Sequence, residues 1–175
     1  YVARQVPAPM YGSRLTLALI ENKLREHRIN GIHLNTVMPR QVIRLGCFTI
    51  CFIKVNHSIA GAYALAITCP LGTVVCTGDF KVDYTPIEGG IIDLPRFAEL
   101  GNKGVLALLA DSTNVERSGY TPSENLVAEG LERQFKNCDQ RIIVTTFASN
   151  MHRIQAILAT AQRHGRKVAV TGRSM

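Results

Sequence analysis

The segment Gly72-Thr-Val-Val-Cys-Thr-Gly-Asp79 places an aspartate directly after a short run rich in β-branched residues. Such a run, bounded by glycines, is typical of a strand. A second polar turn, Val55-Asn56-His57-Ser58, follows another apolar run and lies two strand lengths earlier. Two antiparallel strands joined by a turn would bring His57 and Asp79 to the same edge of a sheet. An imidazole beside a carboxylate is a ligand pair for zinc or a similar divalent ion, although two ligands do not complete a site.

The bulk composition indicates a globular chain. Its 175 residues are the length of one ordinary domain or of parts of two. With 46% hydrophobic and 19% charged residues, the sequence is neither disordered nor membrane-spanning in character. The chain begins at Tyr1 without a signal-peptide pattern and stops directly after a predicted strand. We therefore expect an internal fragment of a larger protein, with no membrane partner.

Charge and cysteine content bear on partners and compartment. The formal net charge of +7 suits a polyanionic partner, but the basic residues are scattered, so ordinary surface charge is an equally good interpretation. Five cysteines, an odd number, predict reduced thiols in a cytoplasmic protein. Cys47 and Cys51 have a weakly metal-like spacing, yet their apolar surroundings favour packing in the core.

The first part of the chain has a strand-rich pattern. Ser13 is expected to cap a helix, and strands with tight turns are expected within 36–55, 62–68 and 73–77. A wholly apolar run over 105–110 predicts a buried strand that ends at Asp111. Asp111 is thus a second carboxylate at a strand end, where sites gather in α/β sheets.

The pattern changes after residue 120. We expect a helix to about residue 136, a strand over 141–146, a helix over 149–163 and a strand over 167–171. Such a β-α-β unit implies parallel strands with a right-handed crossover. The change predicts two domains, 1–117 and 118–175, in a chain of the α/β class.

Each polar residue also has a plainer interpretation when taken singly. His57 alone is more often structural, and Asp79 or Asp111 alone would stabilise a turn. The helix start at Ala148, Ser149 and Asn150 has free amides for a phosphate, but Ser149 as a simple N-cap is the commoner situation. Spacing alone leaves the metal site and its structural alternative evenly weighted.

As a set, these motifs resemble the ribonuclease J family over the whole chain. The motifs are Asn56-His-Ser-Ile59, Leu71-Gly-Thr-Val-Val-Cys-Thr-Gly-Asp79-Phe-Lys-Val-Asp83, Asp111-Ser-Thr-Asn114, Thr146-Phe-Ala-Ser-Asn150 and Gly165-Arg-Lys-Val-Ala-Val-Thr-Gly-Arg-Ser-Met175. That family is an RNA-processing branch of the metallo-β-lactamase superfamily with an inserted β-CASP domain. The resemblance implies part of a metallo-β-lactamase αβ/βα sandwich, followed by the start of a Rossmann-like β-CASP domain.

The resemblance also implies roles for individual residues. By position, His57 would ligate one zinc, Asp79 would bridge two zincs, and Asp111 would orient catalytic groups beside them. Residues Ala148, Ser149 and Asn150 would line the RNA channel. Where the family usually has Pro-Asp-Ser after the Asn-His-Ser-Ile motif, this chain has Ala60-Gly61-Ala62, which alters the loop and removes an acid. The other metal ligands are expected outside residues 1–175, so we predict that this fragment alone is inactive.

The implied activity is zinc-dependent hydrolysis of RNA phosphodiesters, with two Zn²⁺ per complete site and Mn²⁺ as an alternative. The resemblance further implies both endonuclease and 5′→3′ exonuclease activity, in rRNA processing and mRNA decay. It also implies a cytoplasmic homo-oligomer, either a dimer or a tetramer. Two alternatives stay open. One is another metallo-β-lactamase hydrolase, acting on DNA or a small ester, and the other is a non-catalytic RNA-binding homologue.

Overall fold

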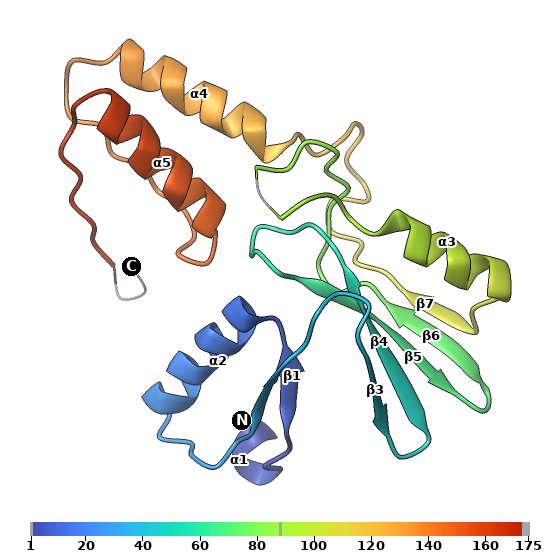
Figure 1. Cartoon of the computed structure of the whole chain (residues 1–175). Helices are drawn as coiled ribbons and strands as arrows, with labels where there is room; N and C mark the ends of the chain where they lie inside the picture. Colours follow the sequence, from blue (N-terminus) through green and yellow to red (C-terminus); the bar gives the residue numbers. More distant parts are fainter. Residues whose placement is uncertain (1, 88, 173–175) are drawn as a thin grey trace.

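The computed structural model describes residues 2–87 and 89–172 and has a mixed α/β fold (Figure 1). Its strands lie in one larger sheet and one two-stranded sheet, and two of its helices form a separate pair. In chain order the elements are α1 (Val2–Gln5), β1 (Met10–Gly12), α2 (Arg14–Glu26), β2 (Leu34–Thr36), β3 (Val42–Leu45), β4 (Phe48–Lys54), β5 (Tyr63–Cys69), β6 (Gly72–Cys76), α3 (Leu94–Lys103), β7 (Ala107–Leu109), α4 (Glu124–Lys136) and α5 (Met151–Arg163).

The larger sheet has the strand order β3-β4-β5-β6-β7. The first four strands are joined as antiparallel hairpins, as the sequence predicts for residues 36–77, whereas β7 pairs parallel to β6. Gly46 forms the first hairpin turn with a φ of 60°, a conformation that glycine adopts without strain. Because β4 and β6 are each antiparallel to β5, they run in the same direction and end at the same edge.

The apolar core lies between the central strands and α3. Side chains alternate along a strand, so Cys51, Ile53 and Val55 of β4 share one face and join a buried cluster with Leu100 of α3. Ile53 is fully buried there. Cys51 is therefore in the core as predicted. Cys47 is exposed, contrary to expectation, because it lies in the turn between β3 and β4.

The opposite face of the sheet meets the small unit formed by β1, α2 and β2. The parallel strands β1 and β2 are connected through α2, whose N-cap is Ser13, as predicted. The Ser13 side chain accepts a hydrogen bond from the Thr16 N–H at 3.3 Å. The Tyr63 hydroxyl of β5 donates to the Val37 carbonyl at 3.2 Å and ties this unit to the sheet.

The helical pair, α4 and α5, forms with its own small buried interior. Ser123 caps α4, and the two helices pack on one another with Phe135 and Ala161 buried. The strands predicted over 141–146 and 167–171 are wrong, since both segments lack strand structure. A β-branched run forms a strand only where a neighbour completes its hydrogen-bond ladder, and Ile143 is 83% exposed instead.

Strand β7 also differs from its prediction. It is shorter than the predicted run over 105–110, and none of its residues is buried. Leu108 is 60% exposed, and β7 lies at the edge of the sheet with β6 as its neighbour. An apolar composition therefore located the strand but not its burial.

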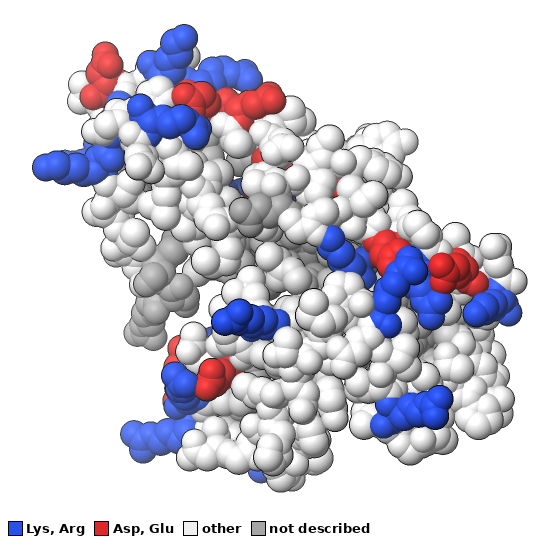
Figure 2. All heavy atoms as spheres, viewed as in Figure 1, with Lys and Arg blue, Asp and Glu red and all other residues white. Residues whose placement is uncertain are grey.

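Basic side chains on one face of the molecule do not gather in a single patch (Figure 2). On the face seen in Figure 2, Lys and Arg side chains lie over several elements, with Asp and Glu side chains among them. On α2, for example, Lys23 pairs with Glu26 and Arg25 with Glu21. None of the described helices combines the length and the apolar character needed to cross a membrane.

Candidate functional site

Three of the predicted site residues follow strand ends at one edge of the larger sheet. His57 comes after β4, Asp79 after β6 and Asp111 after β7. The three strands run in the same direction, since β7 is parallel to β6 and β4 is separated from β6 by one antiparallel strand. A further antiparallel bridge, in which the Lys81 N–H donates to the Asn56 carbonyl at 2.8 Å, joins the loops after β4 and β6.

The structure brings His57 and Asp79 together. The His57 Nε2 atom lies 3.7 Å from the Asp79 Oδ2 atom, and 3.2 Å from the Ser58 hydroxyl. The Asp79 side chain is 78% exposed and that of His57 is 30% exposed, so both are accessible from outside. This spacing is too long for a direct hydrogen bond but suits two atoms that face a common partner.

Asp111 is held beside this pair by Thr77. The buried Thr77 at the end of β6 donates its N–H to the Leu109 carbonyl, and its hydroxyl accepts the Asp111 N–H at 2.9 Å. The Asp111 carboxylate accepts hydrogen bonds from the N–H and hydroxyl of Thr113, and these chiefly lower the pKa of Asp111. The Phe80 amide and the nearby His57 ring lower the same pKa by less. Asp111 thus makes the predicted turn contact and also lies near the candidate pair.

The residues present fit a divalent metal ion in part. The imidazole nitrogen of His57 and the carboxylate of Asp79 are suitable donors, and their separation is compatible with two ligands of one ion. Within residues 2–87 and 89–172, however, no group of three or more His, Cys, Asp or Glu side chains is arranged to hold a metal. Two donors therefore form only part of a coordination sphere.

A small cavity extends from His57 towards the helical pair. It has a volume of about 30 Å³, roughly twice what one water molecule requires. Its lining includes His57 and Lys81 from the sheet edge, Glu124 from α4, and Asn150 and His152 from the start of α5. The beginnings of both helices therefore share this cavity with His57, one of the two candidate metal ligands.

The three residues predicted to contact RNA have different roles in the structure. Asn150, which is only 4% exposed, lines the cavity and is the N-cap of α5, since its side chain accepts the Arg153 N–H at 3.1 Å. The N-cap alternative proposed for Ser149 is therefore wrong by one residue. Ala148 and Ser149 form the turn before it, and the Met151 N–H already donates to the Ser149 carbonyl. Two amides at this helix start are thus occupied, which weakens the helix end as a phosphate site.

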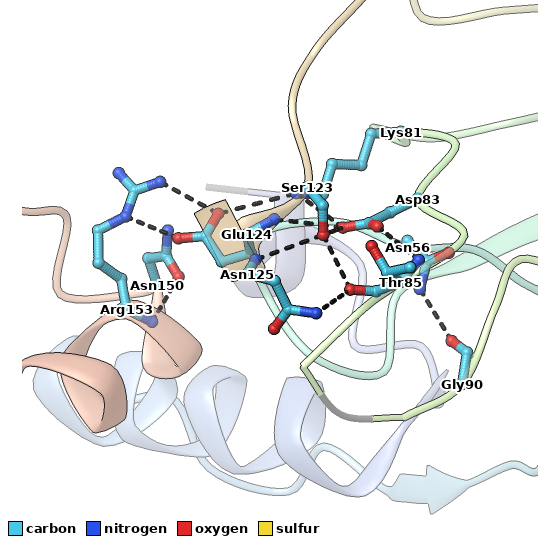
Figure 3. A network of polar contacts seen from close by, with 10 residues as sticks. All are labelled: Asn56, Lys81, Asp83, Thr85, Gly90, Ser123, Glu124, Asn125, Asn150 and Arg153. Carbon is cyan, nitrogen blue, oxygen red and sulfur yellow. Dashed lines mark hydrogen bonds and ion pairs between the residues drawn. The ribbon is translucent and has the colours of Figure 1, made fainter. Parts of the chain in front are cut away.

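Sequence reasoning missed a group of polar residues (Figure 3), three of which line the same cavity as His57. We call the set Lys81, Asp83, Ser123, Glu124 and Arg153 the polar joint. It connects the loop after β6 to the first turns of α4 and α5. No local pattern signals contacts across forty residues, although a helix start with free amides does indicate that some acceptor is needed.

The chain is similar to proteins of one known family. Residues 139–175 match the family model described as "Ribonuclease J, beta-CASP domain", so the end of the chain is of the β-CASP class. The chain is 52% identical to Ribonuclease J of Synechocystis sp., 46% identical to Ribonuclease J of Thermus thermophilus and 40% identical to Ribonuclease J2 of Bacillus subtilis. These alignments cover 100%, 98% and 100% of the chain. The chain belongs to the ribonuclease J family.

The chain spans 28%, 30% and 32% of the lengths of those three relatives. Family membership and the match over residues 139–175 confirm the predicted α/β fold class, with the start of a β-CASP domain at the end of the chain. The fold is also similar to that of a crystal structure of a protein of unknown function from Enterococcus faecalis. That likeness has a TM-score of 0.64 at 17% identity, over 86% of this chain and 39% of the other.

Proposed function

We propose that the full-length protein is a metal-dependent ribonuclease in which His57 and Asp79 are two of the metal ligands. The observation that carries the proposal is the convergence of His57 and Asp79 at 3.7 Å on one sheet edge, with Asp111 beside them. The names of the related proteins support RNA as the substrate. Zinc, with manganese as the alternative, suits the imidazole and carboxylate donors.

The residues of this chain have distinct parts in the proposed reaction. Divalent ions in such a site neutralise charge on the phosphate oxygens and activate water for attack on phosphorus. His57 and Asp79 would hold metal, while Asp111 would orient groups beside them. Ala148, Ser149 and Asn150 would border the RNA path, and of these three Asn150 lines the same cavity as His57.

The proposal extends to the setting of the reaction. The full-length protein is proposed to cleave RNA both endonucleolytically and 5′→3′ exonucleolytically, in rRNA processing and mRNA decay. It is proposed to do so as a cytoplasmic homo-oligomer. We also propose the division into domains at residues 117 and 118. It is supported by the position of that point between the end of β7 and the start of α4, where no helix or strand is found in the described chain.

Metal content and RNA cleavage by the full-length protein test the proposal. We expect the wild type to contain zinc and to cleave RNA, and His57→Ala and Asp79→Ala each to lose metal and most of the cleavage. His33→Ala and Asp139→Ala are matched controls, because both residues are exposed and lie away from the site. These two variants should keep wild-type metal content and rate.

Each alternative predicts a different outcome of the same assay. Preference for DNA or a small ester over RNA would indicate another hydrolase. RNA binding without cleavage, together with metal content that His57→Ala does not change, would indicate a non-catalytic homologue. Residues 1–175 alone should be inactive, and metal-dependent RNA cleavage by that piece would contradict the assignment of further ligands outside it.

A further inference from the structure

The Asp83 carboxylate links the loop after β6 to the start of α4. Asp83 is only 4% exposed. Its Oδ1 atom accepts the Thr85 N–H at 3.0 Å within the loop, while its Oδ2 atom accepts the Ser123 hydroxyl at 3.1 Å and the Glu124 N–H at 3.4 Å. One buried carboxylate therefore accepts hydrogen bonds both from the loop and from an amide in the first turn of α4 that has no acceptor within the helix (Figure 3).

Glu124 carries the connection onward to α5. Its carboxylate receives two hydrogen bonds from the Arg153 guanidinium, at 2.8 and 3.1 Å, and lies 3.7 Å from the Lys81 ammonium. The same Lys81 ammonium is 3.5 Å from the Asp83 carboxylate. Acidic and basic side chains thus alternate from the sheet edge to the first turn of α5, in the order Asp83, Lys81, Glu124 and Arg153. Their formal charges sum to zero.

Apolar packing does not provide a comparable connection. The main buried cluster contains residues of the central strands, α3 and the loop before it, and none from α4 or α5. Within the described residues, α4 and α5 pack chiefly on each other and make no extensive contact with a strand. The position of the helical pair relative to His57 and Asp79 is consequently set by directional polar contacts.

We propose that Asp83 is a positioning residue, which holds the start of the helical pair against the sheet edge so that Asn150 shares the cavity with His57. The inference deepens the proposed function, on which it rests. Asp83 lines the same cavity as His57, but it touches neither His57 nor Asp79 in the polar contacts described, so its loss should leave metal binding intact. It should instead weaken the binding of RNA, because the α5 start would no longer be held beside the metal ligands.

The substitution Asp83→Asn in the full-length protein tests this role. An asparagine keeps the shape but offers one acceptor oxygen, so an amide NH₂ would face either the Thr85 N–H or the Ser123 and Glu124 donors. Loss of a charged acceptor of this kind should raise KM for RNA about tenfold, with a small effect on kcat and unchanged metal content. Ser123→Ala is a milder second variant, and its effect on KM should not add to that of Asp83→Asn.

Asp93→Asn is the matched control. Asp93 is also a partly buried aspartate at a helix start, since it caps α3 and accepts hydrogen bonds from Arg40 and the Arg96 N–H. It belongs to the sheet side and does not line the cavity. Its substitution should leave KM unchanged. Equal increases in KM for the two variants, or a loss of metal in Asp83→Asn, would overturn the positioning role.

Hydrogen exchange separates failure of this inference from failure of the proposed function. In Asp83→Asn, amide exchange should accelerate in the first turns of both α4 and α5, whereas in Asp93→Asn it should accelerate only in α3. If the wild type does not cleave RNA, the proposed function fails, but faster exchange in α5 would still support the positional role. Unchanged exchange at the start of α5 in Asp83→Asn would refute it.

Discussion

The sheet half of the molecule (residues 10–111) and the helical pair differ in the interactions that stabilise them. The sheet half has a continuous buried cluster in which Ile53 and Ala64 are fully inaccessible. The helical pair has a smaller buried set, namely Phe135, Thr160 and Ala161 with Asn150 at the start of α5, and it reaches the sheet through the polar joint. Apolar burial is non-directional and proportional to area, whereas buried hydrogen bonds fix orientation.

This difference assigns separate tasks to the two regions. The sheet half supplies a stable edge on which His57, Asp79 and Asp111 are placed by backbone pairing. The polar joint determines where the start of α5 lies relative to that edge. Damage to the core should therefore unfold the site, whereas damage to the joint should misplace one side of it.

The largest effect is expected from Ile53→Ala. Ile53 is fully buried in the main cluster, so the truncation leaves a cavity and should cost about 2–5 kcal/mol. Hydrogen exchange of the paired amides of β4 and β5 reports that loss. Leu71→Ala, at a residue 85% exposed in the turn after β5, is the control and should change the same exchange little. Similar effects of both variants would contradict the assignment of the core to this face.

Arg153→Met should have an intermediate effect that is confined to the joint. It removes the two charged hydrogen bonds to Glu124, which should cost about 1–2 kcal/mol because Lys81 remains near that carboxylate. Amide exchange should accelerate at the starts of α4 and α5 but not in β4 or β5. Arg133→Met, at an exposed residue on the same helix pair, is the control. Faster exchange throughout the sheet would show that the two regions unfold as one.

The elements of the sheet half could be predicted because their causes are local. Runs rich in β-branched and other apolar residues, separated by glycine-containing turns, define β4, β5 and β6, and Ser13 defines the start of α2. The same pattern placed His57 and Asp79 at one edge, since strand direction follows from short hairpin turns. This part of the candidate site therefore followed from the sequence.

The rest depends on partners that a local pattern does not reveal. The runs over 141–146 and 167–171 have strand composition but no ladder partner among the described residues, and β7 is an exposed edge rather than a buried strand. The contact from Asp83 to Ser123 spans forty residues of sequence without a periodic signal. Burial and long-range hydrogen bonding arise from tertiary structure, which overrides local propensity.

Acid should weaken the joint before it affects the core. Burial is the largest influence on Asp83 and raises its pKa, but hydrogen bonds from Thr85, Ser123 and Glu124, with the charge of Lys81, together lower that pKa below its ordinary value of 3.8. The contribution of Asp83 to stability is therefore complete above the ordinary value and is lost as pH falls through the lower, folded-state value.

The pH effect can be measured as the difference between wild type and Asp83→Asn in amide exchange at the start of α4. After correction for the intrinsic pH dependence of exchange, the difference should be constant near neutral pH and shrink below about pH 4. A difference that grows as the pH falls would mean that the ionised carboxylate does not stabilise the joint. Asp93→Asn provides the comparison on the sheet side, where the Arg40 hydrogen bond is the main cause of a lowered Asp93 pKa.

Glu132→Gln should have the smallest effect, although Glu132 also lies in the helical pair. Its carboxylate contacts Arg163 at 2.8 Å and His164 at 2.7 Å, but the Glu132 and Arg163 side chains are 43% and 58% exposed. Exposed ion pairs are screened by water and salt, so the change in exchange at the α4 and α5 starts should be close to the experimental error. An effect as large as that of Arg153→Met would mean that packing between the two helices, rather than the polar joint, determines where the start of α5 lies.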